Sequence, residues 1–207
     1  MEARFYWVEM GDVPQWLVST PEPVSGGAFE EPWMFADGRV LPDPGPIKAQ
    51  ISHPGEKRTF MFSVIEKAPI VSEAVANVFR AIAPDDVQLF PVSIEGEAEP
   101  YLVVNATRMV DCIDEARCRE VQHYPEDSFP EYEGEYRWIY GLRIDASKTG
   151  GAHVLRPKKF KTAFIVSEEV KSALEAVGNL GVSFERVTGP HESLPPPHEV
   201  QAARGGS

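Results

Sequence analysis

The chain has 207 residues, of which 43% are hydrophobic and 10% aromatic, enough apolar material for one large core or two small ones. It carries 32 acidic and 20 basic residues, and the resulting net charge of −12 argues against broad binding to nucleic acids or anionic lipids. No stretch approaches the roughly 20 apolar residues that span a bilayer, and no apolar export signal is present near Met1. We therefore expect a cytoplasmic protein without membrane contact.

In chain order, most predicted elements are β-strands, because aromatic and β-branched residues alternate with turn formers. Residues 20–58 interrupt this pattern with many prolines and glycines. We expect them to form a long irregular surface segment, anchored by Trp33 and Phe35. The predicted strands comprise residues 5–10, 15–19, 59–66, 87–94, 101–110, 136–145, 152–159 and 182–188.

Two amphipathic helices are predicted, at residues 72–83 and 167–177. Each begins at a serine, Ser72 or Ser167, whose hydroxyl can accept a hydrogen bond from a free amide of the first turn. Each has apolar residues at positions i, i+3, i+4 and i+7, the spacing of a buried helix face. These residues are Val75, Val78, Phe79 and Ile82 in the first helix, and Val170, Ala173, Leu174 and Val177 in the second.

The two helices lie in windows that resemble each other. Residues 69–92 align with residues 164–187 without a gap, and eight positions are identical. We interpret the windows as duplicated strand-helix-strand units, although any α+β protein can reuse this pattern. The predicted fold is α+β, with mostly antiparallel strands and helices packed on a sheet. We expect one compact domain at residues 1–188, made of related halves at about 1–100 and 101–188, and a disordered tail at 189–207.

No motif of a known enzyme class occurs, and the five histidines are dispersed. Cys112 and Cys118 lack the spacing and the second pair of a zinc site and are interpreted as reduced thiols. We therefore predict no catalytic residue, no metal and no cofactor. The alternative is an enzyme of unrecognised type with a site between the two halves, since catalytic groups can assemble from distant positions.

The most informative stretch for function is residues 120–136, here called the acidic-aromatic segment. It contains no lysine or arginine. Carboxylates can steer a basic partner and aromatic rings can anchor it, although an ordinary solvated insertion would look similar. The acidic loops near Asp85, Asp86, Glu95, Glu97 and Glu99 are further candidates. The predicted partner-binding residues are Tyr124, Glu126, Asp127, Phe129, Glu131, Tyr132, Glu133 and Glu135.

One basic cluster contains Arg156, Lys158, Lys159 and Lys161. We interpret it as the solvated, lysine-protected edge of a sheet. The alternative is a nucleic-acid-binding module in which Trp138 or Phe160 stacks on bases, and the net charge of −12 disfavours it.

The C-terminal half contains three distinctive stretches: VVN followed by VDCID, LRIDASK, and FIVSEEVKSALEAVG. In these stretches, and most strongly over residues 101–187, the chain resembles bacterial immunity protein family eleven of polymorphic toxin systems. It implies an α+β protein that binds a cognate toxin domain, often a nuclease-like one, and blocks it stoichiometrically in bacterial competition. An acidic inhibitor suits such a target, because nucleases are basic where they hold phosphates. The resemblance brings no catalytic residues, so we expect a toxin inhibitor that touches neither nucleic acid nor membrane.

Overall fold

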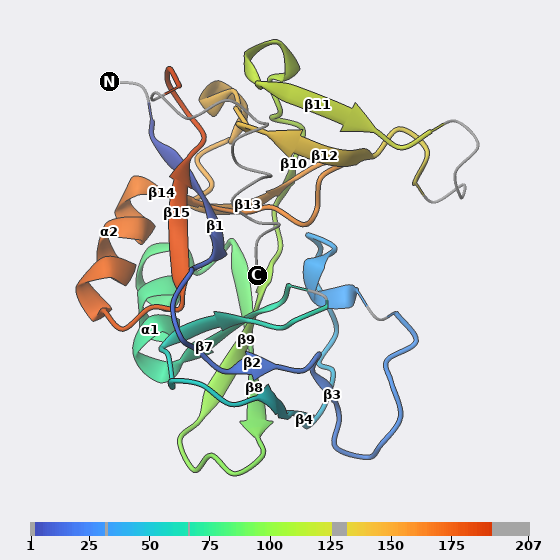
Figure 1. Cartoon of the computed structure of the whole chain (residues 1–207), viewed down its shortest axis with the longest axis vertical. Helices are drawn as coiled ribbons and strands as arrows, with labels where there is room; N and C mark the ends of the chain where they lie inside the picture. The colour runs from blue at the N-terminus through green and yellow to red at the C-terminus, as the bar shows by residue number, and fades with distance from the viewer. Residues whose placement is uncertain (1–2, 32, 66, 126–131, 192–207) are drawn as a thin grey trace.

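A computed structural model describes residues 3–31, 33–65, 67–125 and 132–191. The fold is α+β, with two helices and four mostly antiparallel sheets. In Figure 1 the two helices lie side by side on one flank, between a five-stranded sheet above and a six-stranded sheet below. This arrangement confirms the predicted α+β class with mostly antiparallel strands.

The larger sheet has six strands in the order β3-β4-β8-β9-β7-β6. All neighbours are antiparallel except β4 and β8, which run parallel. Because β9 lies between β7 and β8, these two strands run parallel to each other and α1 connects them. The strands are β3 (Glu22–Pro23), β4 (Ile47–Ala49), β6 (Phe60–Phe62), β7 (Pro69–Ser72), β8 (Val87–Ile94) and β9 (Tyr101–Ala106).

The second sheet has five strands in the order β10-β13-β14-β1-β15. Here the N-terminal strand β1 lies between β14 and β15, antiparallel to both. The first sheet therefore contains β9 from the C-terminal half, and the second contains β1 from the N-terminus, so the expected boundary near residue 100 does not separate the sheets. The strands are β1 (Phe5–Met10), β10 (Met109–Val110), β13 (Val154–Pro157), β14 (Phe164–Ser167) and β15 (Val182–Arg186).

Two small sheets and three short 3₁₀ turns complete the described part of the chain. β2 (Leu17–Val18) pairs with β5 (Ile51–His53), and β11 (Glu120–His123) pairs with β12 (Tyr136–Tyr140). Residues 20–58 therefore contribute short strands to two sheets and are less irregular than expected. The 3₁₀ turns are η1 (Met34–Ala36), η2 (Glu115–Arg117) and η4 (Ala146–Lys148).

The two helices are α1 (Glu73–Ile82) and α2 (Glu168–Val177), close to the predicted limits. Both predicted serine caps are confirmed. The Ser72 hydroxyl accepts from the Val75 amide at 3.5 Å, and the Ser167 hydroxyl accepts from the Val170 amide at 3.3 Å. Buried apolar residues on one face of each helix, including Phe79 of α1, confirm the predicted periodicity.

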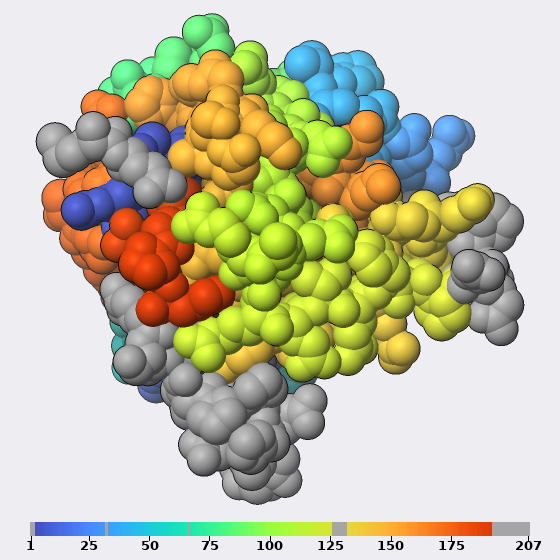
Figure 2. Space-filling model, turned by 90° about the horizontal axis from the view of Figure 1, so that it is seen from above, coloured from blue at the N-terminus to red at the C-terminus, as the bar shows by residue number. Residues whose placement is uncertain are grey.

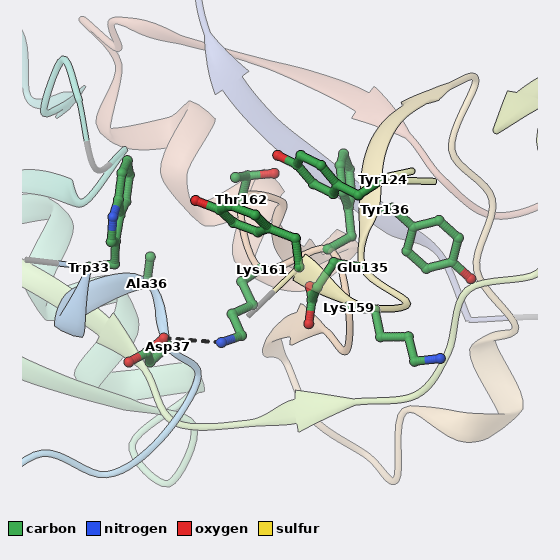
Figure 3. Close-up of a pocket in the computed structure, with 11 residues that line it drawn as sticks. Trp33, Ala36, Asp37, Tyr124, Glu135, Tyr136, Lys159, Lys161 and Thr162 are labelled. Carbon is green, nitrogen blue, oxygen red and sulfur yellow. Dashed lines mark hydrogen bonds and ion pairs between the residues drawn. The ribbon is translucent and has the colours of Figure 1, made fainter. Parts of the chain in front are cut away.

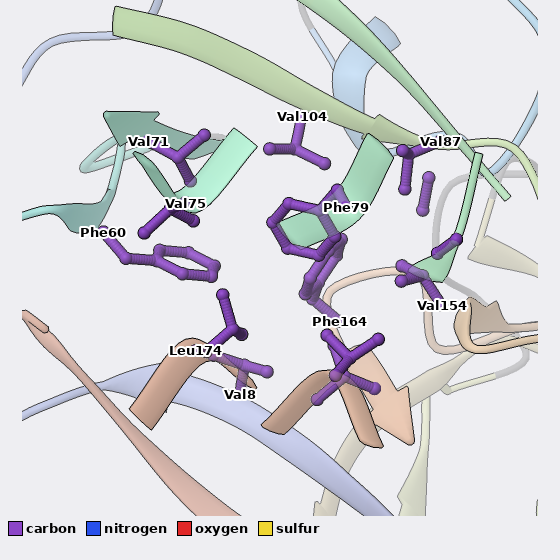
Figure 4. Close-up of a cluster of buried hydrophobic side chains, with 14 of the residues drawn as sticks. Val8, Phe60, Val71, Val75, Phe79, Val87, Val104, Val154, Phe164 and Leu174 are labelled. Atoms are coloured by element: carbon purple, nitrogen blue, oxygen red, sulfur yellow. The ribbon is translucent and has the colours of Figure 1, made fainter. Parts of the chain in front are cut away.

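The main core fills the space between the two large sheets (Figure 4). It joins Phe60 and Val104 of the six-stranded sheet to Val8 and Phe164 of the five-stranded sheet. The rings of Phe60, Phe79 and Phe164 pack edge to face, with centroids 6.3–6.4 Å apart. The two sheets and both helices thus share one apolar core.

Two further cores cover the outer faces of the sheets. Residues from the segment 16–51, including the fully buried Phe35, pack on the six-stranded sheet. Residues from 110–144, including Leu142 and Ile144, pack on the five-stranded sheet. Segments with weak sequence periodicity therefore bury apolar side chains on both sheets.

Order continues past the expected start of the tail. Gly189 is buried, and its carbonyl accepts from Arg143 Nε at 3.2 Å and from Arg117 Nη2 at 3.1 Å. His191 Nε2 lies 2.7 Å from the Arg117 carbonyl oxygen. Residues 189–191 thus belong to the folded part, and the rest of the predicted tail, 192–207, lies outside the described residues.

Candidate functional site

The acidic-aromatic segment begins with strand β11 and ends at the first residue of β12, and these two strands form a ribbon. β11 pairs antiparallel with β12, from Glu120 opposite Tyr140 to His123 opposite Tyr136. Ile139 of β12 is buried, so one face of the ribbon packs on the third core. Figure 2 shows the described residues of the segment, 120–125 and 132–136, on the upper face of the molecule.

Four of the eight predicted partner-binding residues fall within the described structure. Tyr124 and Tyr132 stack with ring centroids 4.6 Å apart and an interplanar angle of 16°. The Tyr124 amide donates to the Glu135 carbonyl at 3.2 Å, and the Glu135 amide donates to the Tyr132 carbonyl at 3.0 Å. Glu133 is exposed. The other four, Glu126, Asp127, Phe129 and Glu131, lie outside the described residues.

An open groove of about 420 Å³ lies beside the segment (Figure 3). It has three walls: the η1 loop, the acidic-aromatic segment, and the turn between β13 and β14. Five of its lining side chains are aromatic. The lining residues are Trp33, Ala36 and Asp37 from the first wall, Tyr124, Tyr132, Glu135 and Tyr136 from the second, and Lys159, Phe160, Lys161 and Thr162 from the third.

Trp33 is the main residue of this groove whose position was predicted wrongly. We expected it to anchor residues 20–58 to the core, yet 48% of it is exposed, whereas Phe35 is fully buried. In the short turn η1, Met34, Phe35 and Ala36 are all buried, which leaves Trp33 at the surface. No local sequence signal indicated that it lines the same groove as Tyr132, because the two residues are almost one hundred positions apart.

Charges on the groove walls largely compensate each other. Lys161 Nζ lies 3.3 Å from Asp37 Oδ1, and Figure 3 shows Glu135 between Lys159 and Lys161. Among the described residues, the Glu135 carboxylate forms no hydrogen bond or ion pair. The groove therefore offers aromatic surface with balanced charge, next to a segment that contains carboxylates and no lysine or arginine.

The turn between β13 and β14 contacts both of the other groove walls, the acidic-aromatic segment and the η1 loop. The Tyr136 amide donates to the Lys159 carbonyl at 2.9 Å, and the Tyr136 ring meets Phe160 edge to face at 6.4 Å. Burial and a hydrogen bond to Glu115 raise the pKa of the Tyr136 hydroxyl, so it stays neutral at physiological pH. Lys159 adopts a φ of +68°, a strained left-handed backbone conformation, at the point where this turn contacts the segment.

The prediction that Arg156 lies on a solvated edge strand is wrong. β13 lies inside the sheet between β10 and β14, and the Arg156 side chain is completely buried. Phe160, a proposed base-stacking residue, is only 7% exposed. The nucleic-acid-binding alternative thus loses one of its four cations and one of its two stacking rings, whereas Lys158 and Lys159 are exposed and Trp138 is partly exposed.

The other acidic loops do not form one surface with the segment. Asp86 is buried, and its Oδ2 accepts from the amides of His153 at 2.6 Å and Val154 at 3.2 Å, so it joins the two sheets. Glu97 pairs with Lys57 at 2.9 Å. Figure 1 places the turn between β8 and β9, which contains Glu97, at the opposite end of the molecule from β11 and β12.

The enzyme alternative predicted a site between the two halves of the chain, and in the described structure the space between the two large sheets holds no such cleft. The space between the sheets is filled by the main core. Burial raises the pKa of the Cys112 thiol to about 12 and also raises that of Cys118, which makes both thiols poor nucleophiles. Within the described ranges, no three His, Cys, Asp or Glu residues cluster as a metal site.

A comparison with protein families matches residues 50–189 to the Imm11 immunity protein family. The match covers more than half of the 207 residues. The chain belongs to the Imm11 family. Membership confirms the predicted resemblance and implies toxin neutralisation, in a family whose members are typically non-enzymatic binders.

The Imm11 match includes the acidic-aromatic segment and the β13–β14 turn but begins after η1. The groove thus combines two walls inside the matched region with one outside it. A comparison with curated proteins gave no match. No helix in the described part of this Imm11 member is long and apolar enough to cross a membrane.

Proposed function

We propose that this Imm11 member binds a basic toxin domain, a nuclease, in the cytoplasm and blocks it stoichiometrically. Docking takes place through the acidic-aromatic segment and the adjoining groove. The observation that carries the proposal is their juxtaposition: a segment rich in carboxylates forms one wall of an open groove lined by five aromatic side chains.

Electrostatic complementarity supports a nuclease as the target. A nuclease needs a positive surface to hold phosphates, and a protein with a net charge of −12 is attracted to that surface. Six carboxylates and no lysine or arginine occur within residues 120–136, so the attraction is strongest at this segment. Such a field accelerates the encounter and fixes orientation more than it adds affinity.

Aromatic anchors supply the affinity that charge alone does not. Tyrosine and tryptophan dominate binding energies at protein interfaces when they lie near the centre of a contact. Here 48% of Trp33 and 38% of Tyr132 are exposed on two different walls of the groove. A partner that covered both would bury large rings at little cost in side-chain entropy.

For the scaffold behind this face, we propose a duplicated strand-helix-strand unit. The strand orders β6-β7-β9-β8 and β13-β14-β1-β15 have the same relative directions, with α1 and α2 at equivalent places. In the second unit β1 stands where β9 stands in the first. The gapless alignment of residues 69–92 with 164–187 supports the same relation.

Co-expression with the product of the adjacent gene tests the function. We expect that product to arrest growth alone, this protein to restore growth, and the two purified chains to form a 1:1 complex. Failure of rescue with both proteins expressed would contradict toxin neutralisation for this pair. Nuclease activity of the partner on DNA or RNA, abolished in the complex, tests the proposed class of target.

Charge neutralisation tests the docking segment. The variant E126Q/D127N/E131Q/E133Q removes four negative charges, and we expect its affinity to fall roughly tenfold or more at low salt and to depend less steeply on salt. The matched control D12N/E73Q/E95Q/E169Q removes the same charge from exposed positions elsewhere. Equal behaviour of the two variants would show that net charge matters and the segment does not.

A further inference from the structure

Arg156 is among the largest fully buried side chains of the protein and lies behind the groove. Its Nη1 donates to the Lys161 carbonyl at 2.5 Å, and its Nη2 donates to the Phe35 carbonyl at 3.4 Å. Lys161 belongs to the β13–β14 turn and Phe35 to η1, so one guanidinium is bonded to the backbones of two groove walls. The guanidinium also lies over the Phe164 ring, 5.4 Å from its centroid.

This position is costly for a cation. No carboxylate among the described residues forms an ion pair with Arg156, and its Nε has no hydrogen-bond partner there. Burial lowers the pKa of Arg156 to about 10, with partial compensation by Asp37, so the group remains charged at neutral pH. Buried charges of this kind are often no more stabilising than an apolar side chain of similar size. Stability alone therefore does not account for the arginine.

The geometry of the groove walls gives a reason for an arginine at position 156. The other polar link between them, the ion pair of Lys161 with Asp37, joins side chains that are 43% and 24% exposed. An exposed pair of this kind contributes little and tolerates movement. A planar guanidinium presents fixed donors in two directions and can hold two backbone carbonyls at a set separation.

We propose that Arg156 is a positioning residue for toxin binding, which fixes the η1 loop against the β13–β14 turn and thereby sets the width of the groove. The inference rests on the proposed docking at this groove. Arg156 touches no partner itself. It holds Trp33, two residues before Phe35, at the distance from Tyr132 at which both rings contact the toxin.

The test measures binding of a catalytically disabled form of the adjacent gene's product, by calorimetry, to R156M, R156K, W33A and R156M/W33A. Methionine fills a similar volume without charge, so we expect the thermal midpoint of R156M to equal or exceed that of the wild type. We expect its affinity to fall about tenfold, which is typical of a lost interface anchor. Lysine keeps the charge but lacks the guanidinium fork, so R156K should be weakened as well.

A second readout separates positioning from stability. W33A should weaken binding about tenfold in the wild type but less than about threefold in R156M, because the displaced wall no longer presents Trp33. Additive losses would overturn the proposal, even if R156M proves less stable. The control K158M removes one positive charge at an exposed neighbouring position, and we expect it to bind within about twofold of the wild type.

The remaining outcomes distinguish the proposals. Wild-type affinity in R156M, with W33A weakened, would overturn the role of Arg156 and leave the docking face intact. Wild-type affinity in both variants would overturn docking at the groove and the role of Arg156 with it. No complex between the wild-type chain and the toxin would contradict the proposed function itself.

Discussion

Asp85 and Asp86 are adjacent acidic residues with opposite environments. Asp85 is exposed, whereas Asp86 is buried and accepts two backbone amide hydrogen bonds from β13 and the residue before it. Its Oδ1 also lies 3.8 Å from Arg108 Nε. Asp86 therefore connects the loop after α1 to the five-stranded sheet. The sequence presents both residues alike, as members of an acidic loop.

We predict that D86A lowers the free energy of unfolding by about 2–3 kcal/mol, because the amides of His153 and Val154 lose a charged acceptor in a buried site. D85A, the matched control, should change it by less than about 0.5 kcal/mol. Urea unfolding followed by circular dichroism measures both. Equal, small effects would mean that water replaces the carboxylate at no cost.

At the scale of elements, the two helix starts have the same cap in different surroundings. Ser72 caps α1 from a partly exposed position, whereas Ser167 is buried and its hydroxyl also contacts His153 Nδ1 at 3.0 Å. The cap distance is shorter at α2, 3.3 Å against 3.5 Å. Ser167 thus takes part in more contacts at the start of α2 than Ser72 does at the start of α1.

We predict that S72A lowers the free energy of unfolding by about 0.5–1 kcal/mol and S167A by about 1–2 kcal/mol. The larger loss at Ser167 follows from the burial of the Val170 amide and from the lost contact with His153. Thermal unfolding of the two variants side by side measures the difference. A loss in S72A equal to or larger than that in S167A would contradict this ranking.

Local signals explain which elements could be predicted. The helix limits followed from serine caps and apolar periodicity, and β1 and β8 were predicted to the residue because they are long and flanked by turn formers. β11 was missed, since Glu120–His123 has no apolar alternation and forms a strand only by pairing with β12. Arg156 and Trp33 were misplaced for a similar reason. Burial of the first and exposure of the second depend on neighbours that are distant in the sequence.

For the candidate site, the sequence predicted one wall of three. The acidic-aromatic segment was recognisable from its composition, and Tyr124, Tyr132 and Glu135 do line the groove. The η1 wall and the β13–β14 turn could not be associated with it, because only the tertiary fold brings them together. Composition indicates a surface rich in one kind of residue, whereas a groove requires the relative placement of separate segments.

At the scale of the whole molecule, the N-terminal strand connects a sheet built mainly from the C-terminal half. β1 lies inside the five-stranded sheet, between β14 and β15, and its Val8 belongs to the main core. The Imm11 match begins at residue 50, so it does not include this strand. Without β1, β14 and β15 would each lose a neighbour, and β15 would have no partner in the sheet.

We predict that a chain lacking residues 1–11 fails to fold cooperatively, because removal of this interior strand exposes the ladder edges of β14 and β15 and opens the main core. A synthetic peptide with residues 3–11 added in trans should restore a cooperative urea transition and toxin binding, and a scrambled peptide should restore neither. If the truncated chain unfolds with the midpoint and slope of the full-length protein, β1 is dispensable. That result would also remove the argument that β1 completes the second strand-helix-strand unit as β9 completes the first.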